Sequence, residues 1–178
     1  AYWSLLGGAS GHFYGGGGSS PLWDFPSGWQ NALDSPGSMS MFYFGRLLRS
    51  RRWDLLVPDY DHTVLTAGYG DINGADYAPA ARTSDGQTVI IYAPTQRTLS
   101  VAMDKISGTA AMGWWFDPSG GTGTFLGVYP TTGTHDFTPP SNDDWVLVLD
   151  DEAAGLGAPG QRVPVASDTV GKLKSPYH

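Results

Sequence analysis

The spacing of hydrophobic positions along the chain changes near residue 60. Residues 2–6 and 34–51 repeat hydrophobic side chains at the three- to four-residue spacing of helices, and two glycines end the first of these segments. Residues 11–15 are hydrophobic but too few for a helix, which favours a buried strand that ends at glycines. The pattern predicts a helix, a strand, a long loop and a second helix over residues 1–60.

The second predicted helix has a clear start signal and follows a long loop. The tripeptide Asp34-Ser35-Pro36 places a capping side chain, which we expect to be Asp34, before a proline suited to a first helical turn. The loop over residues 15–30 is rich in glycine, proline and serine, yet it contains Trp23 and Trp29. Loops of this length are usually functional or disordered, and the aromatic residues favour an ordered loop.

After residue 60 the chain consists of short hydrophobic runs separated by turn signals, which is typical of antiparallel β structure. The runs cover residues 62–69, 78–83, 88–93, 98–103, 113–117, 124–129 and 145–150. Short strands at this spacing predict an antiparallel β-sandwich over residues 61–151, so the fold class is mainly β. Residues 152–178 have no sustained period and are interpreted as an extended or disordered tail.

The composition narrows the classes of function. The 178 residues carry a formal net charge of -7, which argues against a nucleic-acid partner because phosphate binding needs clustered lysine and arginine. The sequence has no cysteine, so thiolate sites are excluded, and no hydrophobic run approaches the roughly 20 residues of a membrane span. Its four histidines are scattered without metal-ligand spacing, and we predict no metal and no cofactor.

Several blocks of sequence occur in the order of a known family. They are AYWSLLGGASGHFYG, then a helix ending LLRSRRWDLLVPD, then AARTSDGQTVIIYAPT, WWFDPSGGTG and FTPPSNDDWVLVLDD. Over residues 1–151 this succession resembles the C-terminal half of the apiosidase-like glycoside hydrolases. Those proteins have a (β/α)8 barrel followed by a small β-sandwich that carries the label "Putative collagen-binding domain of a collagenase". The resemblance implies a bacterial protein that is secreted or periplasmic.

The resemblance implies that residues 1–60 form the last elements of the barrel, with its eighth strand at residues 11–15. Active sites of such barrels lie at the C-terminal ends of the strands. His12 and Tyr14 would then stand at the rim of a sugar pocket, and Trp23 and Trp29 would form part of its wall. The alternatives are packed strand residues for the first pair and loop anchors for the two tryptophans.

We predict no catalytic residue in this chain. Glycoside hydrolysis uses two carboxyl groups across the scissile bond, and the resemblance places them in barrel strands before Ala1. The only glutamate, Glu152, follows the last predicted strand, and Asp143-Asp144 is interpreted as a turn before that strand. The expected role is therefore to supply pocket walls for a polysaccharide or oligosaccharide, with the missing barrel segment upstream or on a partner chain.

Other functions stay open. The β domain alone could be a carbohydrate- or collagen-binding or structural module, although no repeated aromatic platform supports this. Residues 1–60 could instead complete a sheet in a second copy of the chain or in a partner chain. The adjacent Trp114 and Trp115 should point to opposite faces of a strand. One would enter the core, and the other would pack on the helical segment or contact a ligand.

Overall fold

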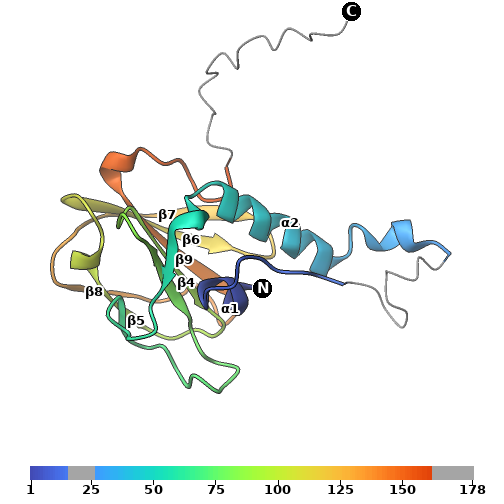
Figure 1. The fold of residues 1–178 in the computed structure, drawn as a ribbon, viewed down its shortest axis with the longest axis horizontal. Helices are drawn as coiled ribbons and strands as arrows, with labels where there is room; N and C mark the ends of the chain where they lie inside the picture. Colours follow the sequence, from blue (N-terminus) through green and yellow to red (C-terminus); the bar gives the residue numbers. More distant parts are fainter. Residues whose placement is uncertain (16–26, 162–178) are drawn as a thin grey trace, which may run out of the picture.

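Three layers of secondary structure make up the fold (Figure 1). The computed structural model describes residues 1–15 and 27–161. Two helices lie against one face of a six-stranded antiparallel sheet, and a three-stranded antiparallel sheet covers the other face. This arrangement confirms the expected fold class, a mainly β sandwich that follows a short helical segment.

Helix α1 spans Tyr2–Leu6 and helix α2 spans Pro36–Arg49. Shorter 3-10 turns are η2 (Trp29–Ala32), η3 (Trp53–Leu55), η4 (Met103–Lys105) and η5 (Glu152–Ala154). The N-terminal cap of α2 is Ser35, so the prediction of Asp34 as the cap is wrong. Ser35 has the extended backbone that a capping residue and a following proline require, and its hydroxyl lies 3.0 Å from that of Ser38.

The strands form two sheets in which every pairing is antiparallel. The six-stranded sheet has the order β1 (Leu56–Pro58), β3 (Ala80–Thr83), β4 (Thr88–Ala93), β9 (Trp145–Asp151), β6 (Ala110–Asp117) and β7 (Thr122–Pro130). The three-stranded sheet has the order β2 (Leu65–Ala67), β5 (Leu99–Ala102) and β8 (Thr134–Phe137). All seven predicted runs contain a strand.

Three segments differ from the prediction. Strands β1 and β8 were missed, since each is short and lies at a sheet edge, where too few residues are buried to give a period. Residues 11–15 were expected to form a strand but have no strand pairing in the described chain. A strand needs neighbours that bind its backbone N–H and C=O groups, and this segment has none beside it. Its assignment to a barrel strand therefore stays a prediction.

The central strands are buried on both faces, which explains their continuous hydrophobic sequences. Their alternate residues enter two separate cores. The core between the two sheets contains Val64, Leu65, Ala78, Ala80, Val89, Ile91, Ala93, Leu99, Val101, Met103, Ile106, Ala111, Trp115, Phe137, Leu147 and Leu149. The core between the helices and the six-stranded sheet contains Tyr2, Leu5, Leu6, Phe44, Leu47, Leu48, Ala81, Ile90, Phe116, Val146 and Val148.

The two adjacent tryptophans of β6 serve the two cores. Trp115 is buried between the sheets, whereas Trp114 is half-buried and packs against the core beneath the helices. A shift in register between Gly113 and Trp114 marks a bulge in the pairing with β7. This placement agrees with the expectation that the outer tryptophan packs on the helical segment.

The chain after β9 returns to helix α2. Arg46 Nε donates to the carbonyl oxygen of Gly160 at 2.9 Å, and the backbone N–H of Gly160 donates to Ser50 Oγ at 3.0 Å. The predicted tail covers residues 152–178. Its first part, residues 152–161, contains η5 and is tied to the helix, while residues 162–178 lie outside the described residues. Within residues 1–15 and 27–161, no helix is long and apolar enough to cross a membrane.

Candidate functional site

The predicted rim residues lie away from the sandwich. His12 and Tyr14 are exposed in the segment that leads from α1, and a Cβ atom at Gly37 would collide with the Tyr14 hydroxyl. Tyr14 thus lies against the first turn of α2. Trp29 is half-buried in η2, which precedes α2 and extends beyond the sheets (Figure 1). Trp23 lies outside the described residues. The role of these four residues in binding substrate remains a prediction.

Polar and aromatic side chains converge elsewhere, in a cleft of about 280 Å3 between the helices and one end of the six-stranded sheet. We call it the tyrosine–aspartate cleft. Its lining comes from α1, α2, the end of β4, the turn after β6 and the start of β9. These residues are Ala1, Tyr2, Ser40, Met41, Tyr92, Asp117, Pro118, Ser119, Asp143, Asp144 and Trp145.

Two tyrosines form an inner wall of this cleft. The rings of Tyr2 and Tyr92 are stacked, with centroids 4.9 Å apart and an interplanar angle of 7°. Burial raises the pKa of both hydroxyls, and the nearby carboxylate of Asp144 raises them further. Both phenols therefore remain protonated hydrogen-bond donors at neutral pH. The Asp144 carboxylate lies near the Tyr92 hydroxyl and helps to raise its pKa.

Asp117 is held in its ionised form. Burial acts to raise its pKa, but hydrogen bonds from the Ser119 hydroxyl and from the backbone of Ser119 and Gly120 outweigh burial and lower the pKa. The Ser119 hydroxyl and backbone N–H each lie 2.7 Å from Asp117 Oδ1. A general acid for glycoside hydrolysis needs the opposite shift, so Asp117 is unsuited to that role.

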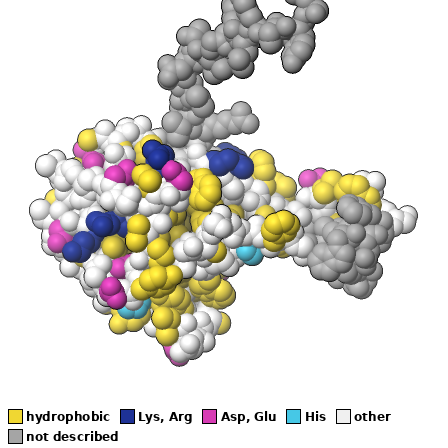
Figure 2. All heavy atoms as spheres, viewed as in Figure 1, with side chains coloured by type: hydrophobic (Ala, Val, Ile, Leu, Met, Phe, Trp, Pro, Cys, Tyr) yellow, Lys and Arg dark blue, Asp and Glu magenta, His cyan; other side chains and the backbone are white. Residues whose placement is uncertain are grey.

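A second hollow, of about 160 Å3, lies beside α1 and is lined by exposed aromatic side chains. Trp3 Nε1 donates to the carbonyl oxygen of Tyr77 at 2.8 Å, and the Tyr60 hydroxyl donates to the carbonyl oxygen of Gly7 at 2.7 Å. These bonds join α1 to the sandwich. Hydrophobic side chains also gather on the lower part of the face shown in Figure 2.

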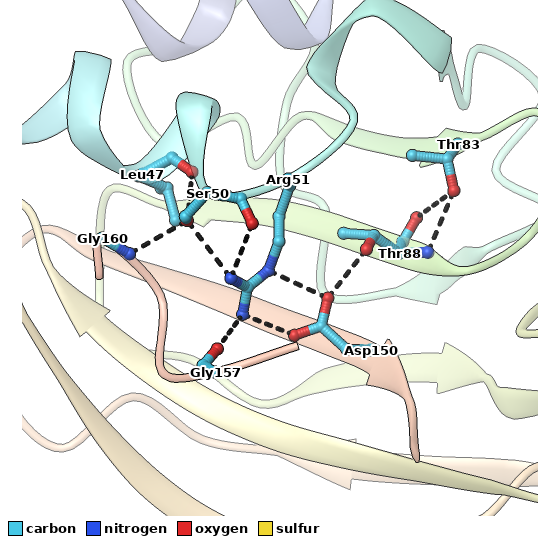
Figure 3. Close-up of polar contacts among 8 residues, drawn as sticks. All are labelled: Leu47, Ser50, Arg51, Thr83, Thr88, Asp150, Gly157 and Gly160. Carbon is cyan, nitrogen blue, oxygen red and sulfur yellow. Dashed lines mark hydrogen bonds and ion pairs between the residues drawn. The ribbon is translucent and has the colours of Figure 1, made fainter. Parts of the chain in front are cut away.

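The most buried polar cluster is centred on Arg51 and Asp150 (Figure 3). Arg51 Nη2 and Nε donate to the two Asp150 oxygens at 2.7 and 3.1 Å, and Thr88 Oγ1 donates to Oδ1 at 2.7 Å. Burial raises the pKa of Asp150, while Arg51 and Thr88 oppose that rise. Its oxygens are already bound and closed to solvent, so this cluster is structural and not a catalytic acid.

The described residues contain no group of three or more histidine or acidic side chains arranged to hold a metal ion. Sequence reasoning missed the tyrosine–aspartate cleft. Asp143 and Asp144 were interpreted as a turn before β9; they lie in a bend that leads into β9, and this bend also borders the cleft. No sequence signal joins Tyr2, Tyr92 and Asp117, because packing of the helices on the sheet brings them together.

Comparison with known families agrees with this architecture. The chain belongs to the family described as "Putative collagen-binding domain of a collagenase", whose model matches residues 57–150. Residues 1–54 match the family described as "Apiosidase-like, catalytic domain". The two matches meet near the junction of the helices and the sandwich, and their order confirms the predicted resemblance to the C-terminal half of an apiosidase-like glycoside hydrolase.

Two solved glycoside hydrolases share this fold. One, described as "Glycoside hydrolase", is 28% identical with a TM-score of 0.68, over 86% of this chain and 36% of its own. A glycoside hydrolase family 5 protein from Bacteroides vulgatus ATCC 8482 is 25% identical with a TM-score of 0.71, over 92% of this chain and 36% of its own. This chain thus spans little more than a third of these relatives. No curated protein matches it.

Proposed function

We propose that this chain acts as the C-terminal portion of a glycoside hydrolase that cleaves a polysaccharide. The observation that carries the proposal is the pair of matches in chain order, first to an apiosidase-like catalytic domain and then to the sandwich family. The catalytic carboxyl pair belongs to a barrel segment that precedes residue 1 or comes from a partner chain. In this proposal residues 1–60 complete that barrel.

Three exposed hydrophobic side chains, two in the segments before α2 and one on α2 itself, support this arrangement. Phe13 is fully exposed, and Leu33 and Phe42 are each about half exposed although all three are large hydrophobic residues. Exposed hydrophobic groups in one region are typical of a surface that packs against other structure. His12 and Tyr14 lie in the same segment and would contact the sugar, with Trp23 and Trp29 lining the wall.

The described carboxyl groups support a non-catalytic role for this chain. Asp117 has a lowered pKa, Asp150 is bound by Arg51, and Glu152 is exposed in η5. Neither Asp117 nor Asp150 is an accessible acid with a raised pKa, which paired-carboxylate hydrolysis requires. The sandwich shares a hydrophobic core with α1 and α2. This shared core favours a sandwich that supports the catalytic domain over one that acts as an independent binding module.

The test compares this chain with a longer protein that includes the roughly 200–300 upstream residues of a complete barrel. The longer protein should release the aglycone from aryl glycosides, and this chain alone should not. In the longer protein, His12→Ala and Tyr14→Phe should each lower kcat/KM by about tenfold or more, while Tyr69→Phe should not. Hydrolysis by this chain alone at an enzymatic rate would overturn the proposal.

A second candidate function is binding of a matrix or saccharide chain by the sandwich. The observation in its favour is the aromatic hollow lined by Trp3, Tyr60 and Tyr77, together with the description of the matched family. Its test is binding of this chain to a collagen-like triple-helical peptide and to soluble polysaccharide. Loss of binding in Tyr60→Ala, with retention in Phe125→Ala, would favour this function.

A further inference from the structure

The loop over residues 69–78 joins β2 to β3 and contains an exposed asparagine followed by a glycine, Asn73-Gly74. The backbone N–H of Ala78 donates to the carbonyl oxygen of Tyr69 at 2.8 Å and closes the base of the loop. The side chain of Asn73 forms no hydrogen bond with the residues that the structure describes. The carbon of its amide group is therefore open to attack by a neighbouring nucleophile.

The packing of the loop requires a glycine directly after Asn73. A Cβ atom at Gly74 would lie 2.5 Å from Asp76 Oδ1 and 3.2 Å from the Cβ atom of Asp71. Asp76 is itself held in place, because Arg97 Nη2 donates to its Oδ2 at 2.7 Å. A glycine has no side chain to shield its backbone nitrogen and is free in conformation. The residue that this packing requires is thus also the one whose nitrogen can most easily reach the Asn73 side chain.

The other asparagines of the sequence lack this combination. Asn31 precedes an alanine and Asn142 precedes an aspartate, so in both cases the next residue has a Cβ atom. Asn142 Oδ1 also accepts a hydrogen bond from the backbone N–H of Gln96 at 3.1 Å, which holds that amide group in place. Asn73 is therefore the asparagine most open to reaction with its own backbone.

We propose that Asn73 is a site of spontaneous deamidation. The backbone nitrogen of Gly74 loses its proton to solvent and attacks Cγ of Asn73, and the side-chain nitrogen leaves as ammonia, which closes a succinimide ring. Water then adds to one of the two ring carbonyls and breaks one C–N bond, which leaves an aspartate or an isoaspartate. The Gly74 N–H donates to the carbonyl oxygen of Asp71 at 2.8 Å, so the reaction waits for this turn to open.

The products alter the contact between this loop and α1. Isoaspartate places an extra methylene in the main chain, which is incompatible with the turn that Gly74 and Asp71 close. Either product adds a carboxylate near those of Asp71 and Asp76, and like charges repel. Tyr77 belongs to the same loop, and its carbonyl oxygen accepts from Trp3 Nε1 at 2.8 Å. Deamidation therefore weakens a bond that joins α1 to the sandwich.

The experiment incubates the full chain in warm, mildly alkaline buffer and follows each asparagine by peptide mass spectrometry. The peptide that contains Asn73 should gain the mass of an amide converted to an acid about tenfold faster than the peptide that contains Asn142, because only Asn73 precedes a glycine. Labelling by an isoaspartyl methyltransferase should mark the same peptide. Equal rates at the two asparagines, or no conversion of Asn73, would overturn the proposal.

The variant Asn73→Gln separates the chemistry from the effect on α1. Glutamine keeps an exposed amide at this position but would have to close a larger and less favourable ring, so it should remain unmodified. In the incubated parent chain the NMR signal of the Trp3 indole N–H should shift as deamidation proceeds, and in Asn73→Gln it should stay constant. A constant Trp3 signal in a fully deamidated parent chain would refute the proposed effect on the contact with α1.

Discussion

Arg51 and Asp150 form a two-point ion pair whose side chains are 1% and 0% exposed. Arg51 follows helix α2, and Asp150 lies in β9, the central strand that pairs with both β4 and β6. Arg51 Nη2 also donates to the carbonyl oxygen of Gly157 at 2.9 Å. One guanidinium group therefore joins the helical segment, the six-stranded sheet and the chain that leaves it.

The first prediction concerns this ion pair. Arg51→Ala should lower the free energy of unfolding by about 3–5 kcal/mol, because it leaves the Asp150 charge buried without a partner. The double variant Arg51→Met with Asp150→Leu should recover much of that loss, since no charge is then buried. Urea unfolding followed by tryptophan fluorescence measures both changes.

A neighbouring arginine provides the control for that measurement. Arg52 pairs with Asp54 at 2.8 Å, but both side chains are largely exposed. Exposed ion pairs contribute little to stability, so Arg52→Ala should leave the urea midpoint almost unchanged. Similar losses of stability in Arg51→Ala and Arg52→Ala would contradict the structural role given to the buried pair.

The second prediction tests the core shared by the helices and the sheet. Leu47 of α2 is fully buried in that core, and Leu47→Ala should cost about 2–5 kcal/mol. Unfolding should stay a single transition, with the hydrogen exchange of the α2 amides and the tryptophan fluorescence reporting the same free energy of unfolding. Phe42→Ala, on the exposed side of the same helix, should cost less than about 1 kcal/mol.

A third prediction compares two glycines with nearly equal backbone angles. Gly121 has φ +68° and Gly133 has φ +69°, a conformation that an alanine adopts at a cost of roughly 1–2 kcal/mol. A Cβ atom at Gly121 would collide with the ring of Tyr43 in α2, whereas nothing lies within 4 Å at Gly133. Gly121→Ala should therefore be less stable than Gly133→Ala by about 1–3 kcal/mol, the added cost of the collision.

Thermal unfolding of the two glycine variants gives this difference directly. Equal melting temperatures would mean that the turn after β6 does not press on α2. The double variant Gly121→Ala with Tyr43→Ala removes the ring that collides with the new Cβ atom. It should recover part of the extra loss if the collision is its cause, whereas a purely backbone effect would not be relieved.

A fourth prediction concerns how the stability of the fold changes at acid pH. Hydrogen bonds from Ser119 and Gly120 hold the pKa of Asp117 in the folded chain below the ordinary value for an aspartate, so its ionised form stabilises the fold. This contribution is present above the unfolded pKa and is lost as the pH falls through the folded pKa. Asp117→Asn should therefore reduce stability at neutral pH and lose less on acidification than the parent chain does.

Unfolding free energies at about pH 6 and pH 3 measure this effect, on either side of a normal aspartate pKa. Ser119→Ala removes the hydroxyl that lies 2.7 Å from Asp117 Oδ1 and should shift the acid dependence in the same direction by a smaller amount. Parallel pH profiles for Asp117→Asn and the parent chain would show that this carboxylate gives no such stabilisation.

The sequence predicted the strands well where burial is continuous. Strand β4 has the predicted bounds of Thr88–Ala93, because its hydrophobic run is buried on both faces and bounded by turns. The edge strand β8 was missed, since only Phe137 of its four residues is buried and no period can be read. Residues 11–15 have no strand pairing in the described chain, because a hydrophobic run alone does not supply the neighbouring strand that pairing needs, so their strand assignment stays a prediction.

The candidate site was harder to predict for a physical reason. The rim residues His12 and Tyr14 came from a family resemblance, and their role depends on structure beyond the described residues. The tyrosine–aspartate cleft instead depends on tertiary packing, which brings Tyr2 beside Tyr92 although 90 positions separate them. Hydrophobic periodicity identifies each of these tyrosines as a partly buried residue but not as a neighbour of the other.

The core beneath the helices also has an evolutionary consequence. Residues from the segment matched to the apiosidase-like family and residues from the segment matched to the sandwich family interleave in it. A gene fusion that moved the sandwich alone would expose Ile90, Val146 and Val148 on a bare sheet face, an aggregation hazard. The two segments are therefore not independent domains that can be exchanged separately, and we expect them to occur together in the same protein.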